Sequence, residues 1–80
     1  MITSVLQIRM ARAALGWSLR DAAEISSLGL STVRRAETDE GFTSLTEANR
    51  RAITSAFTDA GIIFTGDAGS PGVQLVLKPR

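Results

Sequence analysis

The stretch WSLRDAAEISSLGLSTVRRAE, residues 17–37, decides the fold of this chain. Its first part predicts a helix over residues 19–26, because a serine with an aspartate three residues later is a typical helix start. Serines and a glycine surround Leu28 and favour a tight turn over a continuous helix. A second helix is predicted over residues 30–37. Two short helices joined by such a turn form a helix-turn-helix outline.

A further helix is predicted before this stretch, over residues 5–15. Ser4 and Gln7 have the spacing of a capping box, and Gly16 provides a stop. The apolar residues expected to face the core recur at helical spacing: Leu6, Met10, Ala13 and Ala14. The first twenty residues carry three arginines and no acid, as a transit peptide also does, but the helical spacing favours a core helix.

The segment after residue 37 is predicted to hold a loop and then a fourth helix. Residues 38–44, TDEGFTS, are polar and contain a glycine, so we interpret them as a loop with Phe42 turned back toward the core. The fourth helix begins at a capping box from Ser44 to Glu47 and ends before Gly61.

A β-hairpin is expected at the C-terminal end. Residues 62–65 and 73–77 are β-prone, and the turn-rich sequence GDAGSPG separates them as a long loop. Glycines there could cradle a phosphate, but the lysine and the following helix of a P-loop are missing, which favours a plain loop.

The composition narrows the classes of function. Eighty residues with 44% apolar side chains predict one domain with one core. The chain has no cysteine and no histidine, which removes disulfides, thiolate nucleophiles, the usual zinc and haem ligands and the commonest general base. We therefore expect no enzyme activity and no cofactor. Arginines interrupt the only long apolar segment, so we expect no membrane partner and a cytoplasmic, nucleoid-associated location.

The charge is unevenly distributed along the chain. The net charge is only +1, but residues 1–35 carry five arginines and two acids, whereas residues 36–80 carry four basic and six acidic side chains. A basic first half can direct a polyanion to one face.

Residues 17–37 resemble, position by position, the helix-turn-helix of the phage Cro and lambda-repressor-like family, also called the xenobiotic-response-element type. The resemblance extends to about residue 60 through the flanking helices. It implies a mainly α fold, a four-helix lambda-repressor-like helix-turn-helix domain over residues 1–61, with a C-terminal β-hairpin over residues 62–80. The matching positions are Ala23, Leu28, Thr32 and Val33. The departures are Leu19, Ser27 and Gly29, where relatives often have a polar residue, a glycine, and a serine or threonine cap.

The resemblance also implies site residues. The expected base-reading residues lie on the helix over residues 30–37 and are Leu30, Ser31, Arg34 and Arg35. The expected phosphate contacts are Arg9, Ser18, Arg20 and Thr32. Arg12 and Glu37 are expected to form an ion pair, the alternative being two unrelated surface charges. A second alternative is that Leu30 packs inward and the two arginines form a solvated face. Trp17 is expected in the core rather than stacked on a base.

The hairpin is a candidate dimer contact, because two strands alone leave open sheet edges and are marginally stable. The expected contact residues are Ile62, Phe64, Val73, Leu75 and Leu77, and the alternative is a hairpin that covers a helix of its own chain. The sequence thus predicts a sequence-specific DNA-binding regulator, a small dimeric repressor on a palindromic operator of double-stranded DNA. The alternative is an antitoxin or antiactivator that acts mainly by binding another protein.

Overall fold

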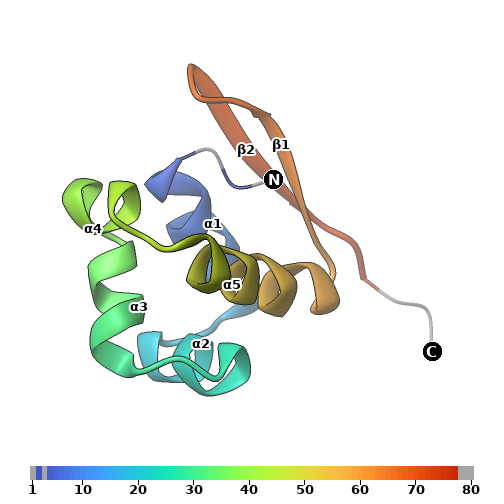
Figure 1. Ribbon diagram of the computed structural model, residues 1–80. Helices are drawn as coiled ribbons and strands as arrows, with labels where there is room; N and C mark the ends of the chain where they lie inside the picture. The colour runs from blue at the N-terminus through green and yellow to red at the C-terminus, as the bar shows by residue number, and fades with distance from the viewer. Residues whose placement is uncertain (1, 3, 78–80) are drawn as a thin grey trace.

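The described part of the chain, Ile2 and residues 4–77, forms five helices followed by two strands in the computed structural model (Figure 1). Their bounds are α1 Val5–Leu15, α2 Leu19–Ser26, α3 Leu30–Ala36, α4 Asp39–Thr43, α5 Glu47–Asp59, β1 Ile62–Asp67 and β2 Ser70–Leu75. The prediction of a mainly α fold with a C-terminal β-hairpin is confirmed. Positions 1, 3 and 78–80 of the predicted segments 1–61 and 62–80 lie outside the described residues.

The first two helices begin at the capping boxes that the sequence predicts. Ser4 and Gln7 form the box at the start of α1, and Gly16 ends this helix with a φ of 68°. Ser18 and Asp21 form the box at the start of α2. Each box satisfies backbone N–H groups that have no partner within the helix.

The buried face of α1 differs from the predicted one. The expected stripe is largely exposed, and Leu6 at its start is 50% exposed. The buried residues are instead Gln7, Ile8 and Ala11. Apolar spacing alone misplaces this face because two polar side chains of α1, those of Gln7 and Arg12, have partners inside the fold.

Gln7 joins α1 to the hairpin. Its fully buried side chain donates from Nε2 to the carbonyl oxygens of Thr65 and Gly72, at 3.1 and 2.9 Å. Its Oε1 accepts a hydrogen bond from the Ser4 N–H at 3.3 Å. Because a buried amide is costly unless it is hydrogen-bonded, these contacts fix the position of the hairpin on α1. The sequence suggested only the capping role of Gln7.

A turn from Ser27 to Gly29 separates α2 from α3 and excludes one continuous helix. Ser27 has a φ of 60° and a ψ of 32°, and its N–H donates to the Glu24 carbonyl at 3.2 Å. The Leu28 N–H donates to the Ala23 carbonyl at 3.0 Å, and the Leu28 side chain packs against the core. The turn redirects the chain, so α3 lies at one edge of the molecule (Figure 1).

Ser27→Gly is expected to raise the free energy of unfolding by about 0.5–1 kcal/mol. The left-handed conformation strains a residue with a Cβ by roughly 1–2 kcal/mol, and the greater freedom of glycine in the unfolded chain offsets part of this gain. Chemical denaturation checks it, with Ser26→Gly as the control. Ser26 is the last residue of α2 and its Oγ donates to the Ala22 carbonyl at 2.6 Å, so that change should destabilise. An equal decrease in the free energy of unfolding in both variants would contradict the strain at Ser27.

The predicted loop over residues 38–44 is wrong, because these residues contain α4. Thr38 caps this helix by accepting a hydrogen bond from the Gly41 N–H at 3.0 Å, and two acidic residues in its first turn suit the positive helix end. Five residues are too few for a periodic apolar pattern, which is why the sequence did not reveal the helix. Phe42 is half-buried and packs against the core as expected, and the Arg50 guanidinium lies 4.4 Å from its ring centroid.

Helix α5 begins later than predicted. Its N-cap is Thr46, which accepts a hydrogen bond from the Asn49 N–H at 3.1 Å, whereas Ser44 is occupied as the C-cap of α4. The buried side includes Ile53 and Phe57, which carry the apolar period of this helix.

The predicted long hairpin loop is also wrong, because the strands extend into it. Asp67 Oδ1 accepts hydrogen bonds from the N–H groups of Gly69 and Ser70, each at 2.9 Å, and Gly66 has a φ of 74°. These contacts leave only Ala68 and Gly69 between the strands. The antiparallel register is Ile62↔Leu75, Ile63↔Gln74, Phe64↔Val73, Thr65↔Gly72, Gly66↔Pro71 and Asp67↔Ser70.

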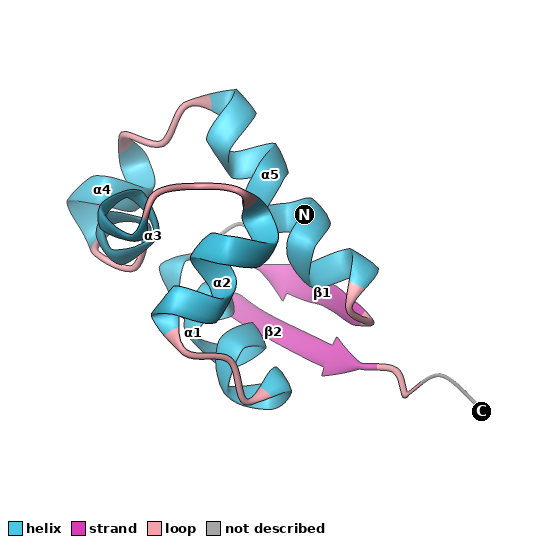
Figure 2. Ribbon diagram, turned by 90° about the horizontal axis from the view of Figure 1, so that it is seen from below, coloured by secondary structure: helices cyan, strands magenta, loops and turns pink. Residues whose placement is uncertain are grey.

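The hairpin packs on its own helices, with β2 beside α1 (Figure 2). Ile62 is 2% exposed and belongs to the core, and Phe64, Val73 and Leu75 pack against the same cluster. Ile62 is therefore not available as a dimer contact, whereas Phe64, Val73 and Leu75 are half-buried against their own chain, as the alternative of a hairpin that covers its own helices expects. Of the predicted contact residues, only Leu77 stays well exposed, at 81%.

The core gathers residues from both ends of the chain around α5. Phe57 stacks on Trp17 with ring centroids 5.4 Å apart, so Trp17 packs in the core as expected. The ring of Phe57 also meets that of Phe64 of β1 edge to face. Within the described residues, no helix combines the length and the apolar character needed to cross a membrane.

Candidate nucleic-acid interface

The outward side of α3 carries two exposed arginines. Val33 and Ala36 are buried, whereas Ser31, Arg34 and Arg35 are exposed. Helix α3 lies at the edge of the molecule away from the hairpin (Figure 1). No carboxylate of the described residues forms an ion pair with either arginine. Helix α3 therefore presents two unpaired positive charges to the solvent.

Leu30 departs from its predicted role as a base reader. It is half-buried and packs against Ala22, Ala23 and Val33 at the contact between α2 and α3. The inward-packing alternative therefore describes Leu30, because the apolar side chain gains more from this contact than from the solvent. The other three predicted base readers remain exposed.

Glu37, the C-cap of α3, is held by Arg12 of α1. Arg12 Nε and Nη2 donate to the two carboxylate oxygens of Glu37 at 2.7 and 3.0 Å, and Nη1 donates to the Trp17 carbonyl at 3.1 Å. The Glu37 side chain is 10% exposed and that of Arg12 is 26% exposed. The hydrogen bonds to Glu37 raise the pKa of the Arg12 guanidinium above its ordinary value, because they favour its charged form. The expected ion pair is thus present and joins α1 to the end of α3.

Arg9 also contacts Glu37. Its Nη2 donates to the Glu37 backbone carbonyl at 2.6 Å, and its Nε lies 3.9 Å from Glu37 Oε1. A cation at this place satisfies a carbonyl at the end of α3, where the helix dipole is negative. Arg9 therefore supports the end of α3, and because its side chain is still 55% exposed, its role as a phosphate contact stays a prediction.

At the start of α2, the predicted phosphate contacts Ser18 and Arg20 have different surroundings. Ser18 Oγ accepts a hydrogen bond from the Asp21 N–H at 3.0 Å, and the Ser18 N–H donates to the Asp21 carboxylate at 2.9 Å. This capping box places a negative charge where an anion would otherwise be attracted. Arg20 is exposed and forms no ion pair within the described residues.

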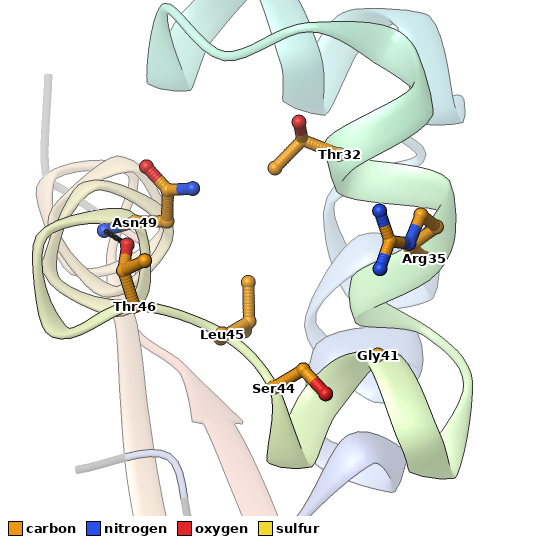
Figure 3. Close-up of a pocket in the computed structure, with 7 residues that line it drawn as sticks. All are labelled: Thr32, Arg35, Gly41, Ser44, Leu45, Thr46 and Asn49. Carbon is orange, nitrogen blue, oxygen red and sulfur yellow. Dashed lines mark hydrogen bonds between the residues drawn. The ribbon is translucent and has the colours of Figure 1, made fainter.

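A groove of about 120 Å³ lies between α3 and the start of α5 (Figure 3). Thr32 and Arg35 line it from α3, and their side chains point toward Asn49 across the gap (Figure 3). The remaining lining residues come from α4 and its connection to α5: Gly41, Ser44, Leu45 and Thr46. The lining contains one positive charge, several hydroxyl and amide groups, and no acid. Thr32, a predicted phosphate contact, thus shares a polar groove with Arg35.

The sequence interpretation missed Ser44, Thr46 and Asn49 as members of this surface. The Thr46 to Asn49 spacing is a recognisable helix start, but only the packing of α4 on α3 brings that start beside Arg35. The candidate interface therefore consists of the exposed side of α3 and the adjoining groove. Comparison of the chain with models of protein families, with curated proteins and with solved structures finds no match.

Proposed function

We propose that this protein is a sequence-specific DNA-binding transcriptional regulator, a small repressor that places α3 in the major groove of its operator. The observation that carries the proposal is the turn after Ser27, which leaves α3 at the edge of the molecule with Arg34 and Arg35 exposed and unpaired. The major groove is about 12 Å wide and admits a helix, and a guanidinium can bind guanine N7 and O6 together. In this proposal α2, the turn and α3 form a helix-turn-helix of the lambda-repressor-like type.

The proposal includes two copies on a palindromic operator. Helix-turn-helix dimers bind half-sites about 34–36 Å apart, so a two-fold operator requires two recognition helices at that spacing. Ile62 is buried in its own core and is left out of the proposed contact between the two copies. Exposed apolar side chains on the hairpin and just beyond β2 are Ile63, Val76 and Leu77. Sedimentation with and without operator DNA measures the number of copies.

A second candidate function is favoured by the same three exposed side chains. Exposed apolar side chains can mark a protein contact, as an antitoxin or antiactivator would need. The two functions differ in their response to salt. Each phosphate contact lowers log K by about 0.9 per unit of log salt concentration on duplex DNA, whereas an apolar protein contact does not weaken in this way.

Selection of duplexes from a random library is expected to yield a palindromic site bound with strongly salt-dependent affinity. Replacement of both Arg34 and Arg35 by alanine should then weaken binding at least about 30-fold, since each lost base or phosphate contact contributes on the order of 1–3 kcal/mol. Fluorescence anisotropy of the labelled duplex measures the affinity, and a footprint measures the symmetry.

Arg51→Ala is the matched control. It removes one positive charge, from an exposed ion pair with Glu47 that lies outside the groove and outside α3, so the affinity should stay within about threefold of the wild type. Absence of an enriched duplex at low salt, or equal losses in the control and the double variant, would overturn the proposed function.

A further inference from the structure

We propose that the two adjacent arginines have different tasks on DNA: Arg35 binds a backbone phosphate in the groove beside α3, and Arg34 reads a base. This inference rests on the proposed function and assigns a separate role to each arginine. It starts from the groove between α3 and the start of α5, which contains the side chain of Arg35 and not that of Arg34 (Figure 3).

The helix geometry separates the two side chains. Successive residues of an α-helix point about 100° apart, and residues three apart lie on nearly the same side. Thr32 and Arg35 therefore share the side of α3 that faces α5, and both line the groove. Arg34 points about 160° away from Thr32 around the helix axis, on the side where Leu30 packs against α2. The two guanidinium groups therefore cannot bind at the same place on DNA.

The chemistry of the groove suits a phosphate rather than a base edge. Arg35 supplies a positive charge, and the Asn49 amide points toward it across the gap (Figure 3). Three further lining residues, Thr32, Ser44 and Thr46, carry hydroxyl groups that can donate to a phosphate. The Thr46 oxygen accepts from the Asn49 N–H, which leaves its hydroxyl proton available to donate. A volume of about 120 Å³ exceeds the roughly 10–15 Å³ that one water needs, so a phosphate group has room.

The position of the groove agrees with that chemistry. A helix lying in the major groove has a sugar-phosphate strand on each of its sides, and the base edges lie in front of it. The groove lies between α3 and the start of α5, so in the proposed complex it would face one of these strands (Figure 3). Arg34 lies outside the groove and forms no ion pair within the described residues, which leaves its planar fork available for guanine.

Lysine substitutions at the two positions test this division. A phosphate accepts an ammonium group as a point charge, so Arg35→Lys should keep the affinity within about threefold of the wild type. A guanine read by two hydrogen bonds needs the guanidinium fork, so Arg34→Lys should weaken binding about tenfold or more on the selected operator. Both arginines are exposed and unpaired in the described structure, so the variants should fold, and Trp17 fluorescence checks this.

Alanine substitutions give a second, independent readout. Arg35→Ala should weaken binding equally on the operator and on point-mutated operators, and should lower the salt slope by about 0.9. Arg34→Ala should instead remove the preference at one operator position. Asn49→Ala should be non-additive with Arg35→Ala, because both side chains line one groove, and additive with Arg34→Ala.

The outcomes separate this inference from the proposed function. A wild-type protein without a preferred duplex overturns the proposed function and the inference with it. A wild-type protein that binds its operator, combined with a changed base preference in Arg35→Lys or with coupling between Arg34 and Asn49, overturns the division of tasks alone. Equal responses of the two arginines to lysine also overturn it.

Discussion

Arg12→Met is expected to lower the free energy of unfolding by about 3 kcal/mol. The substitution leaves the Glu37 carboxylate, which is 10% exposed, without its bidentate partner. Loss of one member of a buried pair typically costs 3–5 kcal/mol, and the lower end applies because Arg9 Nε remains 3.9 Å from the carboxylate. Denaturation by urea, followed by the fluorescence of the single tryptophan, measures the change.

Substitution of the other member of the pair, Glu37, should lower the free energy of unfolding by less. In Glu37→Gln, the Arg12 guanidinium can be hydrated by water, since the Arg12 side chain is 26% exposed. The glutamine also keeps one oxygen that can accept a hydrogen bond from Arg12. We expect a loss of about 1–2 kcal/mol, and a coupling of at least about 1 kcal/mol in the double variant. Arg51→Met is the control, because it breaks a pair that is more than three-quarters exposed on both sides and should change stability by less than about 1 kcal/mol. Strict additivity of Arg12→Met and Glu37→Gln would show that the pair contributes nothing beyond its parts.

Gly41→Ala is expected to destabilise the protein by about 3 kcal/mol, for a steric reason. A Cβ at this position would overlap the carbonyl oxygen of Arg35 and lie 2.8 Å from Thr38 Oγ1. The first obstacle is backbone, so α4 must move away from the end of α3, and overpacking of this kind costs 1–3 kcal/mol or more. A domain of this size should then melt roughly 12–24 °C lower, as thermal denaturation can measure.

Gly29→Ala provides the matched comparison. A Cβ there would have Thr32 Oγ1 as its nearest neighbour, at 3.9 Å, which is ordinary contact. The helix cap weakens slightly, so the loss should stay below about 1 kcal/mol. If the two alanine variants have the same melting temperature, α4 can shift away from α3 at no cost, and stability does not depend on the close approach at Gly41.

Most helix ends could be predicted because their signals are local. Ser4, Ser18 and Gly16 act on groups within a few residues of themselves, and the structure uses each of them as the sequence indicates. Helix α4 could not be predicted in this way, since five residues carry no apolar period and the helix packs against α3 through the close approach of Gly41 to the Arg35 carbonyl.

The orientation of side chains was less accessible to sequence reasoning. Leu30 and the inner residues of the hairpin are apolar, and their pattern does not say whether they face their own core or a partner. The candidate groove could not be predicted from the sequence either. Its walls come from α3 and from a helix start that is 11 residues beyond Arg35, and only tertiary packing brings Thr46 beside it.

The hydrogen bonds of Gln7 also bear on how the chain reaches its native state. One side chain near the beginning accepts from its own helix start and donates to carbonyls 58 and 65 residues away. Contacts of such long sequence separation form late, because the closure entropy of the intervening chain must be overcome first. Docking of the hairpin on α1 therefore joins the two ends of the polypeptide, through the Gln7 amide together with the apolar side chains of the two strands.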